Sequence, residues 1–135
     1  MLGDAIEVSI VVKDLEAAIK RFETLFDLKL YERRESKDFG FKNAILPLGK
    51  GHIDLIQPTD PSSAVARFLE TRGEGIYLVG FEVEDIPASV KTLRERGARV
   101  IQRSQDDPVA WVHPKDAHGL FVELRKAEQY NVDWD

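Results

Sequence analysis

Three carboxylates interrupt otherwise apolar runs of this sequence, where their side chains could do chemistry. Glu7 lies in I-E-V-S-I, Asp54 in I-D-L-I and Glu123 in F-V-E-L. Because side chains alternate between the two faces of a β-strand, each carboxylate either faces solvent or shares a face with functional neighbours. Carboxylates gathered on one surface can hold a hard cation or move a proton.

The sequence repeats itself, and the repeat relates two of these carboxylates. Residues 7–15 (EVSIVVKDL) correspond to residues 78–86 (LVGFEVEDI), and residues 52–55 (HIDL) correspond to residues 121–124 (FVEL). Asp54 is therefore equivalent to Glu123, whereas Glu7 is equivalent to Leu78, which cannot ligate a metal. A duplicated unit of this size usually packs on its copy, because neither half buries its apolar face alone. We expect the carboxylates to face a cleft between the two halves.

Each half has the pattern of a strand, a helix and three further strands. Asp14 and Asp85 are typical helix N-caps, each followed by apolar residues at helical spacing. Strands are expected at 5–12, 28–35, 40–47 and 51–57 in the first half, and at 76–83, 98–103, 107–113 and 118–125 in the second. The predicted fold class is α+β, with two βαβββ modules pairing into a half-open barrel. The modules should cover about residues 5–58 and 76–126, with a connector at about 59–75 and a polar tail at 127–135.

Composition limits the partners and the chemistry. The chain of 135 residues carries a formal net charge of −5 and contains no cysteine. An acidic chain argues against a nucleic-acid partner, and the lack of cysteine excludes disulfides, thiolate metal sites and cysteine nucleophiles. No apolar run approaches the roughly 20 residues that a membrane span requires. We expect a cytoplasmic protein that binds a small molecule and neither nucleic acid nor membrane.

Three ionised carboxylates around one point would repel one another and raise each other's pKa. A hard cation such as Mg²⁺, Mn²⁺ or Ca²⁺ could sit between them, or a cationic side chain could neutralise them. Alternatively, one carboxyl could keep its proton and act as an acid or base near neutral pH. His52 shares a strand face with Asp54, and Arg125 shares one with Glu123. Together with Trp111, these two residues are also the predicted substrate contacts.

Stretches along most of the chain resemble the vicinal oxygen chelate superfamily, which includes glyoxalase I, bleomycin-resistance proteins and extradiol dioxygenases. Within it, the sequence is most similar to methylmalonyl-CoA epimerases. The matching stretches are VVKDLEAAI (11–19), IDLIQPT (53–59), AVARFLETRGEGI (64–76), FEVEDI (81–86), VHPKD (112–116) and GLFVEL (119–124).

The resemblance implies four metal-binding positions, which fall on Glu7, Asp54, Leu78 and Glu123. Only Glu123 keeps the residue typical of the family, and both of the family's histidines are absent. Without imidazole the donor set is hard oxygen, so the predicted metal ligands are Glu7, Asp54 and Glu123 for Mg²⁺, Mn²⁺ or Ca²⁺. The resemblance also implies a catalytic carboxylate in a segment that D-F-G matches in this sequence, at residues 38–40. The predicted catalytic residues are therefore Glu123 and Asp38.

Two functions remain open from the sequence. The first is a lyase or isomerase, such as an epimerase, that acts on a small carbonyl compound or acyl thioester with a degenerate metal site. The alternative is a non-catalytic binding protein that sequesters a small molecule without a metal, as bleomycin-resistance relatives do. In both cases open sheet edges and the resemblance suggest a homodimer.

Overall fold

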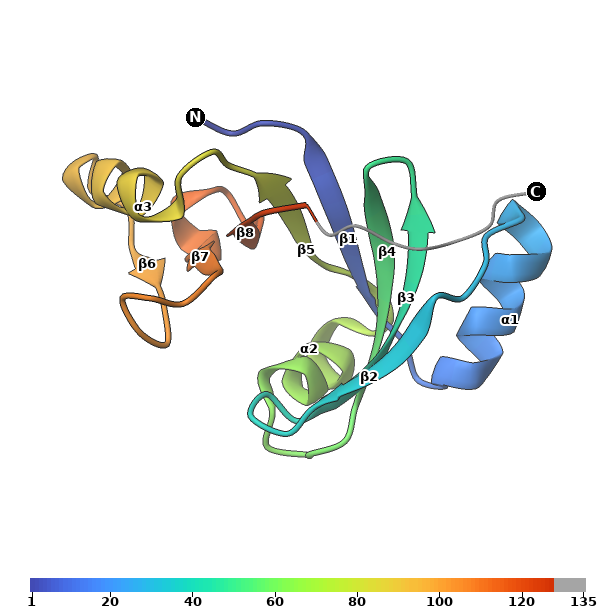
Figure 1. The fold of residues 1–135 in the computed structure, drawn as a ribbon. Coiled ribbons are helices and arrows are strands. Elements are labelled where there is room, and N and C mark those ends of the chain that lie inside the picture. The colour runs from blue at the N-terminus through green and yellow to red at the C-terminus, as the bar shows by residue number, and fades with distance from the viewer. Residues whose placement is uncertain (128–135) are drawn as a thin grey trace. The chain divides into compact units, whose positions relative to one another are not determined.

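The structure, a computed structural model, describes residues 1–127. In chain order its elements are β1 (Ala5–Val11), α1 (Leu15–Phe26), β2 (Glu32–Ser36), β3 (Phe41–Leu48), β4 (Gly51–Pro58), α2 (Ala64–Arg72), β5 (Gly75–Glu82), α3 (Ile86–Glu95), β6 (Val100–Ile101), β7 (Ala110–Val112), a 3₁₀ turn (Pro114–Asp116) and β8 (Val122–Arg125) (Figure 1). The order strand–helix–three strands occurs twice, with α2 between the copies. The predicted α+β class and its two βαβββ modules are confirmed.

The described chain forms two compact units that differ slightly from the two repeats. Unit 1 comprises Met1–Glu7 and Leu78–Ala127, and the described part of unit 2 is Val8–Tyr77. Strand β1 therefore gives its first residues to unit 1 and its last residues to unit 2. The module and connector boundaries expected from the sequence stay predictions, and the tail, beyond Ala127, lies outside the described residues.

In unit 2 the strand order is β2-β3-β4-β1, in which β2, β3 and β4 pair antiparallel, and α1 packs against β3 and β4. Helix α1 begins where the Asp14 carboxylate accepts a hydrogen bond from the Ala17 N–H, as its N-cap pattern predicted. It ends at Asp27, which adopts a left-handed conformation with φ of 56°. Leu28 and Leu30 follow this turn and pack against the core without forming part of a strand. The strand predicted at 28–35 therefore begins only at residue 32.

In unit 1, β5 runs parallel to β8, and β8, β7 and β6 continue antiparallel. Helix α3 starts at the N-cap Asp85, whose carboxylate accepts from the Ala88 N–H. The last three strands are shorter than predicted. The Asp107 carboxylate accepts from the Arg103 and Val109 N–H groups and holds a turn before β7. The 3₁₀ turn and Gly119, with φ of 95°, delay β8 until residue 122.

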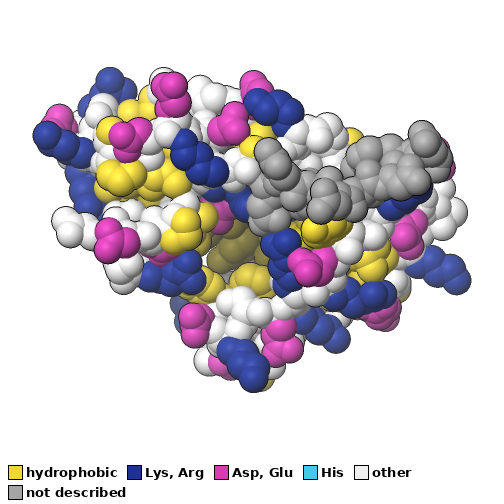
Figure 2. All heavy atoms as spheres, in the orientation of Figure 1, with side chains coloured by type: hydrophobic (Ala, Val, Ile, Leu, Met, Phe, Trp, Pro, Cys, Tyr) yellow, Lys and Arg dark blue, Asp and Glu magenta, His cyan; other side chains and the backbone are white. Residues whose placement is uncertain are grey.

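The surface in view carries acidic and basic side chains interspersed with apolar ones (Figure 2). Of the helices within residues 1–127, none combines the length and apolar character needed to cross a bilayer.

Candidate active site

In unit 1, Glu7 and Glu123 share the guanidinium of Arg125. The Arg125 Nη1 donates to Oε1 of Glu7 and, at 3.3 Å, to Oε2 of Glu123. The exposed fractions of the three side chains are 4% for Glu7, 9% for Glu123 and 15% for Arg125. The second oxygen of Glu123 accepts from the indole Nε1–H of Trp111 at 3.0 Å. Two buried carboxylates thus share one guanidinium, and Glu123 also accepts from a neutral donor.

Strand spacing and register account for this arrangement. Glu123 and Arg125 lie two residues apart on β8 and therefore point to the same face. Trp111 is the register partner of Glu123 on β7, and Gly80 is its partner on β5. A Cβ on Gly80 would lie 2.9 Å from Glu7 Cβ, 3.2 Å from Arg125 Cδ and 3.3 Å from Glu123 Oε2. The cluster closes because residue 80 has no side chain.

Burial, followed by the negative charge of Glu7, raises the pKa of Glu123 to about 8. The Arg125 charge and the Trp111 hydrogen bond act in the opposite direction, but they do not outweigh these effects. Burial is the largest cause, because removing a carboxylate from water disfavours its charged form, and the nearby Glu7 carboxylate adds to this effect. Glu123 therefore titrates near neutral pH, in the range useful to an acid–base catalyst. Of the arrangements considered from the sequence, the structure shows the cationic neighbour, and the raised pKa of Glu123 favours a protonated carboxyl below about pH 8.

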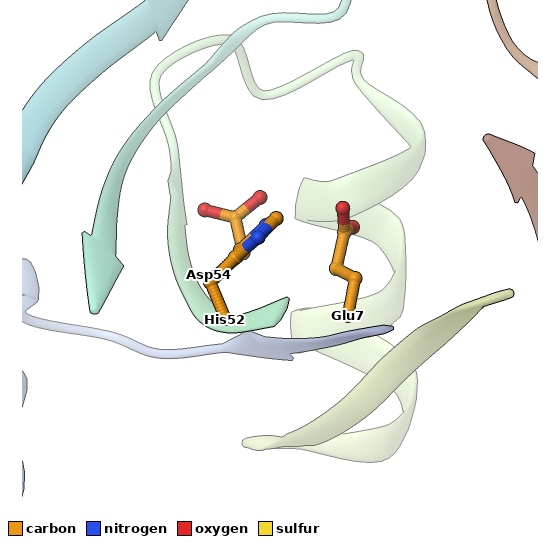
Figure 3. Close-up of side chains that lie close together, drawn as sticks. All are labelled: Glu7, His52 and Asp54. Carbon is orange, nitrogen blue, oxygen red and sulfur yellow. The ribbon is translucent and has the colours of Figure 1, made fainter. Parts of the chain in front are cut away.

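In unit 2, His52 and Asp54 lie two residues apart on β4. A ligating atom of each lies within 4.8 Å of the other, and Figure 3 shows both side chains on the same side of β4. His52 is buried, and the Oδ1 of Asp54 accepts from the Asn43 Nδ2 at 2.9 Å. Glu7, also labelled in Figure 3, belongs to unit 1, where it pairs with Arg125.

The structure thus gathers Glu7, Trp111, Glu123 and Arg125 in unit 1, and His52 and Asp54 in unit 2. Asp38 lies apart from these groups within its own unit, exposed in the turn between β2 and β3. Its catalytic role stays a prediction, as do the predicted substrate contacts.

Two residues of these groups were missed from the sequence. Asn43 could have been found as a polar residue within the strand-like run F-K-N-A-I-L. Gly80 could have been found as a glycine inside a predicted strand, because such a glycine often marks a close approach of other atoms.

The carboxylates of unit 1, as arranged, do not fit a divalent cation. Arg125 already contacts one oxygen of Glu7 and one of Glu123, so a divalent ion bound to these two oxygens would lie against the guanidinium, even if water completed its shell. His52 and Asp54 offer an imidazole and a carboxylate, which are ligand types that metals accept. The predicted set of Glu7, Asp54 and Glu123 divides between the two units, so a metal held by all three stays a prediction.

Comparison with known proteins assigns this chain to a family. The family model of the glyoxalase/bleomycin resistance protein/dioxygenase superfamily matches residues 7–112. An ethylmalonyl-CoA/methylmalonyl-CoA epimerase from Cereibacter sphaeroides is 34% identical over 133 residues, which are 93% of this chain and 99% of that protein. The mitochondrial methylmalonyl-CoA epimerase of Homo sapiens is 29% identical over 93% of this chain and 75% of its own length.

Solved structures give the same result. The methylmalonyl-CoA epimerase from Mycobacterium tuberculosis superposes with a TM-score of 0.85 at 30% identity, covering 95% of this chain and 90% of that one. A Streptomyces coelicolor methylmalonyl-CoA epimerase in complex with 2-nitronate-propionyl-CoA has a TM-score of 0.87 at 24% identity, covering 96% and 100%, which supports the fold. The chain therefore belongs to the glyoxalase/bleomycin resistance protein/dioxygenase superfamily, within which it is similar to the methylmalonyl-CoA epimerases.

Proposed function

We propose that this protein is an isomerase that inverts the α-carbon of an acyl-CoA thioester of the malonyl type. The observation that carries the proposal is the buried carboxyl of Glu123, which titrates near neutral pH beside Arg125 and Trp111. The similarity to ethylmalonyl-CoA and methylmalonyl-CoA epimerases supplies the substrate class.

Epimerisation requires one group to remove the proton next to the thioester carbonyl and a proton to return on the opposite face. A carboxyl that titrates near the working pH can take up and release that proton with little free-energy difference. In the proposal Glu123 is one such group, and Asp38 is the candidate for the second. Trp111 holds Glu123 in place through its indole N–H.

The test is exchange of the α-proton with solvent. Methylmalonyl-CoA and ethylmalonyl-CoA incubated with the protein in heavy water should gain deuterium at the α-carbon, measured by mass spectrometry. Glu123→Gln should abolish exchange of the α-proton that Glu123 is proposed to remove, because an amide cannot act as the acid or base. Glu16→Gln is the matched control, since that exposed carboxylate forms an ion pair with the exposed Arg33 in unit 2. Its loss should leave the exchange unchanged.

The alternative function predicts a different outcome. A sequestering protein would bind the acyl-CoA, detectable by calorimetry, and would show no deuterium incorporation with or without added divalent metal. That result would refute the isomerase proposal. The expected homodimer is tested separately, by sedimentation of the protein at micromolar concentration.

A further inference from the structure

We propose that Arg125 is the resident cation of this site and stands where a divalent metal ion would otherwise bridge Glu7 and Glu123. The protein would then handle its substrate without a divalent metal bound to these carboxylates. The catalytic consequence rests on the proposed function, whereas the metal-binding consequence does not.

The contacts of the guanidinium carry the inference. One nitrogen, Nη1, donates to an oxygen of each carboxylate, which is the bridging position between them. Both carboxylates and the arginine are largely buried, so their charges are poorly screened by water. A divalent ion bound to these oxygens would deprive the guanidinium of its two negatively charged partners. It would also place a second cation next to the guanidinium. Removing one partner from a buried ion pair is strongly unfavourable, because it leaves an uncompensated charge.

The position of Arg125 is built into the sheet. Its Nε donates to the carbonyl of Lys126 at 3.3 Å, which orients the planar fork. Its Cδ lies over Gly80, at 3.2 Å from where a Cβ would be, so the aliphatic stem packs against β5. Arg125 is therefore positioned by contacts along its side chain as well as by the two carboxylates.

The chemistry of the proposed function has a use for this charge. Removing a proton next to a thioester carbonyl places negative charge on the carbonyl oxygen, and an adjacent positive group stabilises it. The guanidinium supplies a fixed positive charge beside the carboxyl proposed to move the proton. Such a site should work in the presence of a chelator.

Metal binding is tested directly by titration of tag-free protein with Mn²⁺, followed by electron paramagnetic resonance of the free ion. The wild type should bind no stoichiometric Mn²⁺ through these carboxylates. Arg125→Met should gain affinity by roughly tenfold or more, equivalent to about 1.4 kcal/mol, because two buried carboxylates then lack their cation. Arg125→Lys keeps the charge and should gain none. Arg99→Met is the matched control, since it breaks an exposed ion pair with Asp116 in the same unit.

The inference is overturned if the wild type binds Mn²⁺ stoichiometrically and Glu7→Gln weakens that binding by roughly tenfold, or 1.4 kcal/mol. This measurement uses no arginine variant, so it decides the matter even if Arg125→Met does not fold. Equal Mn²⁺ binding by folded Arg125→Met and Arg99→Met would also overturn it.

The activity arm separates this inference from the proposed function. Deuterium exchange by the wild type should be unchanged after treatment with a chelator. Arg125→Met should lose roughly 10²-fold in rate, the usual effect of removing one group that stabilises a developing oxyanion, and Mn²⁺ should restore part of it. Exchange that disappears on chelation and returns with metal would overturn the inference while the proposed function stands. Absence of exchange under every condition would refute the function, and the Mn²⁺ titration would still decide the role of Arg125.

Discussion

Replacing Glu123 with glutamine should remove a large part of the pH dependence of folding stability. Burial and the charge of Glu7 raise the pKa of Glu123 from 4.5 to about 8 in the folded chain. Between pH 4.5 and about pH 8, Glu123 keeps a proton in the folded state that it releases in the unfolded state. The contribution of Glu123 to the free energy of unfolding is therefore largest below pH 4.5, falls as the pH rises towards 8, and levels off above it.

The size of the effect follows from the shift. Each pKa unit corresponds to about 1.4 kcal/mol, so a group that titrated alone would lose about 3 kcal/mol of stability by pH 7. Because Glu7 and Arg125 are coupled to Glu123, the change is spread over the cluster, and a difference of about 2–3 kcal/mol is expected. Glutamine resembles the protonated carboxyl: its oxygen can accept from Trp111 and its amide can donate to Glu7.

The assay is urea denaturation of the wild type and Glu123→Gln at pH 5, 7 and 8.5. Relative to the variant, the wild type should lose about 2–3 kcal/mol between the lowest and highest pH. Glu16→Gln serves as the control, because its exposed partner Arg33 lowers the pKa of Glu16, which confines any effect to acid pH. Parallel stability curves for the wild type and Glu123→Gln would refute the assignment of a protonated Glu123.

Two further predictions concern the packing and the turn of unit 1. Gly80→Ala should destabilise the fold by about 1–3 kcal/mol, because the new methyl group meets the Glu7 side chain, whereas Gly75→Ala on the same strand has open space and should be nearly neutral in thermal melts. Asp107→Asn should cost about 1–2 kcal/mol, because the Asp107 carboxylate is 2% exposed and pairs with the half-exposed Arg103. Arg103 lowers the pKa of Asp107 from 3.8 to about 2. The stability from this pair is present above pH 3.8 and lost as the pH falls through 2, so acid titration of the asparagine variant should lack that loss.

The helices could be predicted from the sequence because their signals are local. Asp14 and Asp85 each accept from the N–H three residues on, as N-caps do, and apolar residues at helical spacing follow them. The ends of the late strands could not be predicted in this way. They depend on the Asp107 side chain and on the left-handed Gly119, and neither feature changes the apolar pattern of the sequence.

The site was predictable to the extent that strand periodicity defines it. A spacing of two residues correctly placed Glu123 with Arg125 and His52 with Asp54 on shared faces. The partner of each group was not predictable. Contact between Glu7 and Arg125 depends on the order of strands in unit 1, and on the absence of a side chain at Gly80. Long-range pairing of this kind leaves no local mark beyond an unexpected glycine in a strand.

The repeat shows how two equivalent carboxylates came to differ in chemistry. Asp54 and Glu123 correspond in the two copies, and two residues later Ile56 corresponds to Arg125. Ile56 is 2% exposed and packs with Val11 and Val65, so the first copy fills this position with apolar contacts. Asp54 accepts from the neutral side-chain amide of Asn43. In the second copy Arg125 contacts both Glu7 and Glu123, yet burial and the negative charge of Glu7 outweigh its positive charge and raise the pKa of Glu123 to about 8. The second copy therefore combines a buried carboxyl of raised pKa with an adjacent guanidinium, and this combination makes Glu123 the acid–base candidate of the pair.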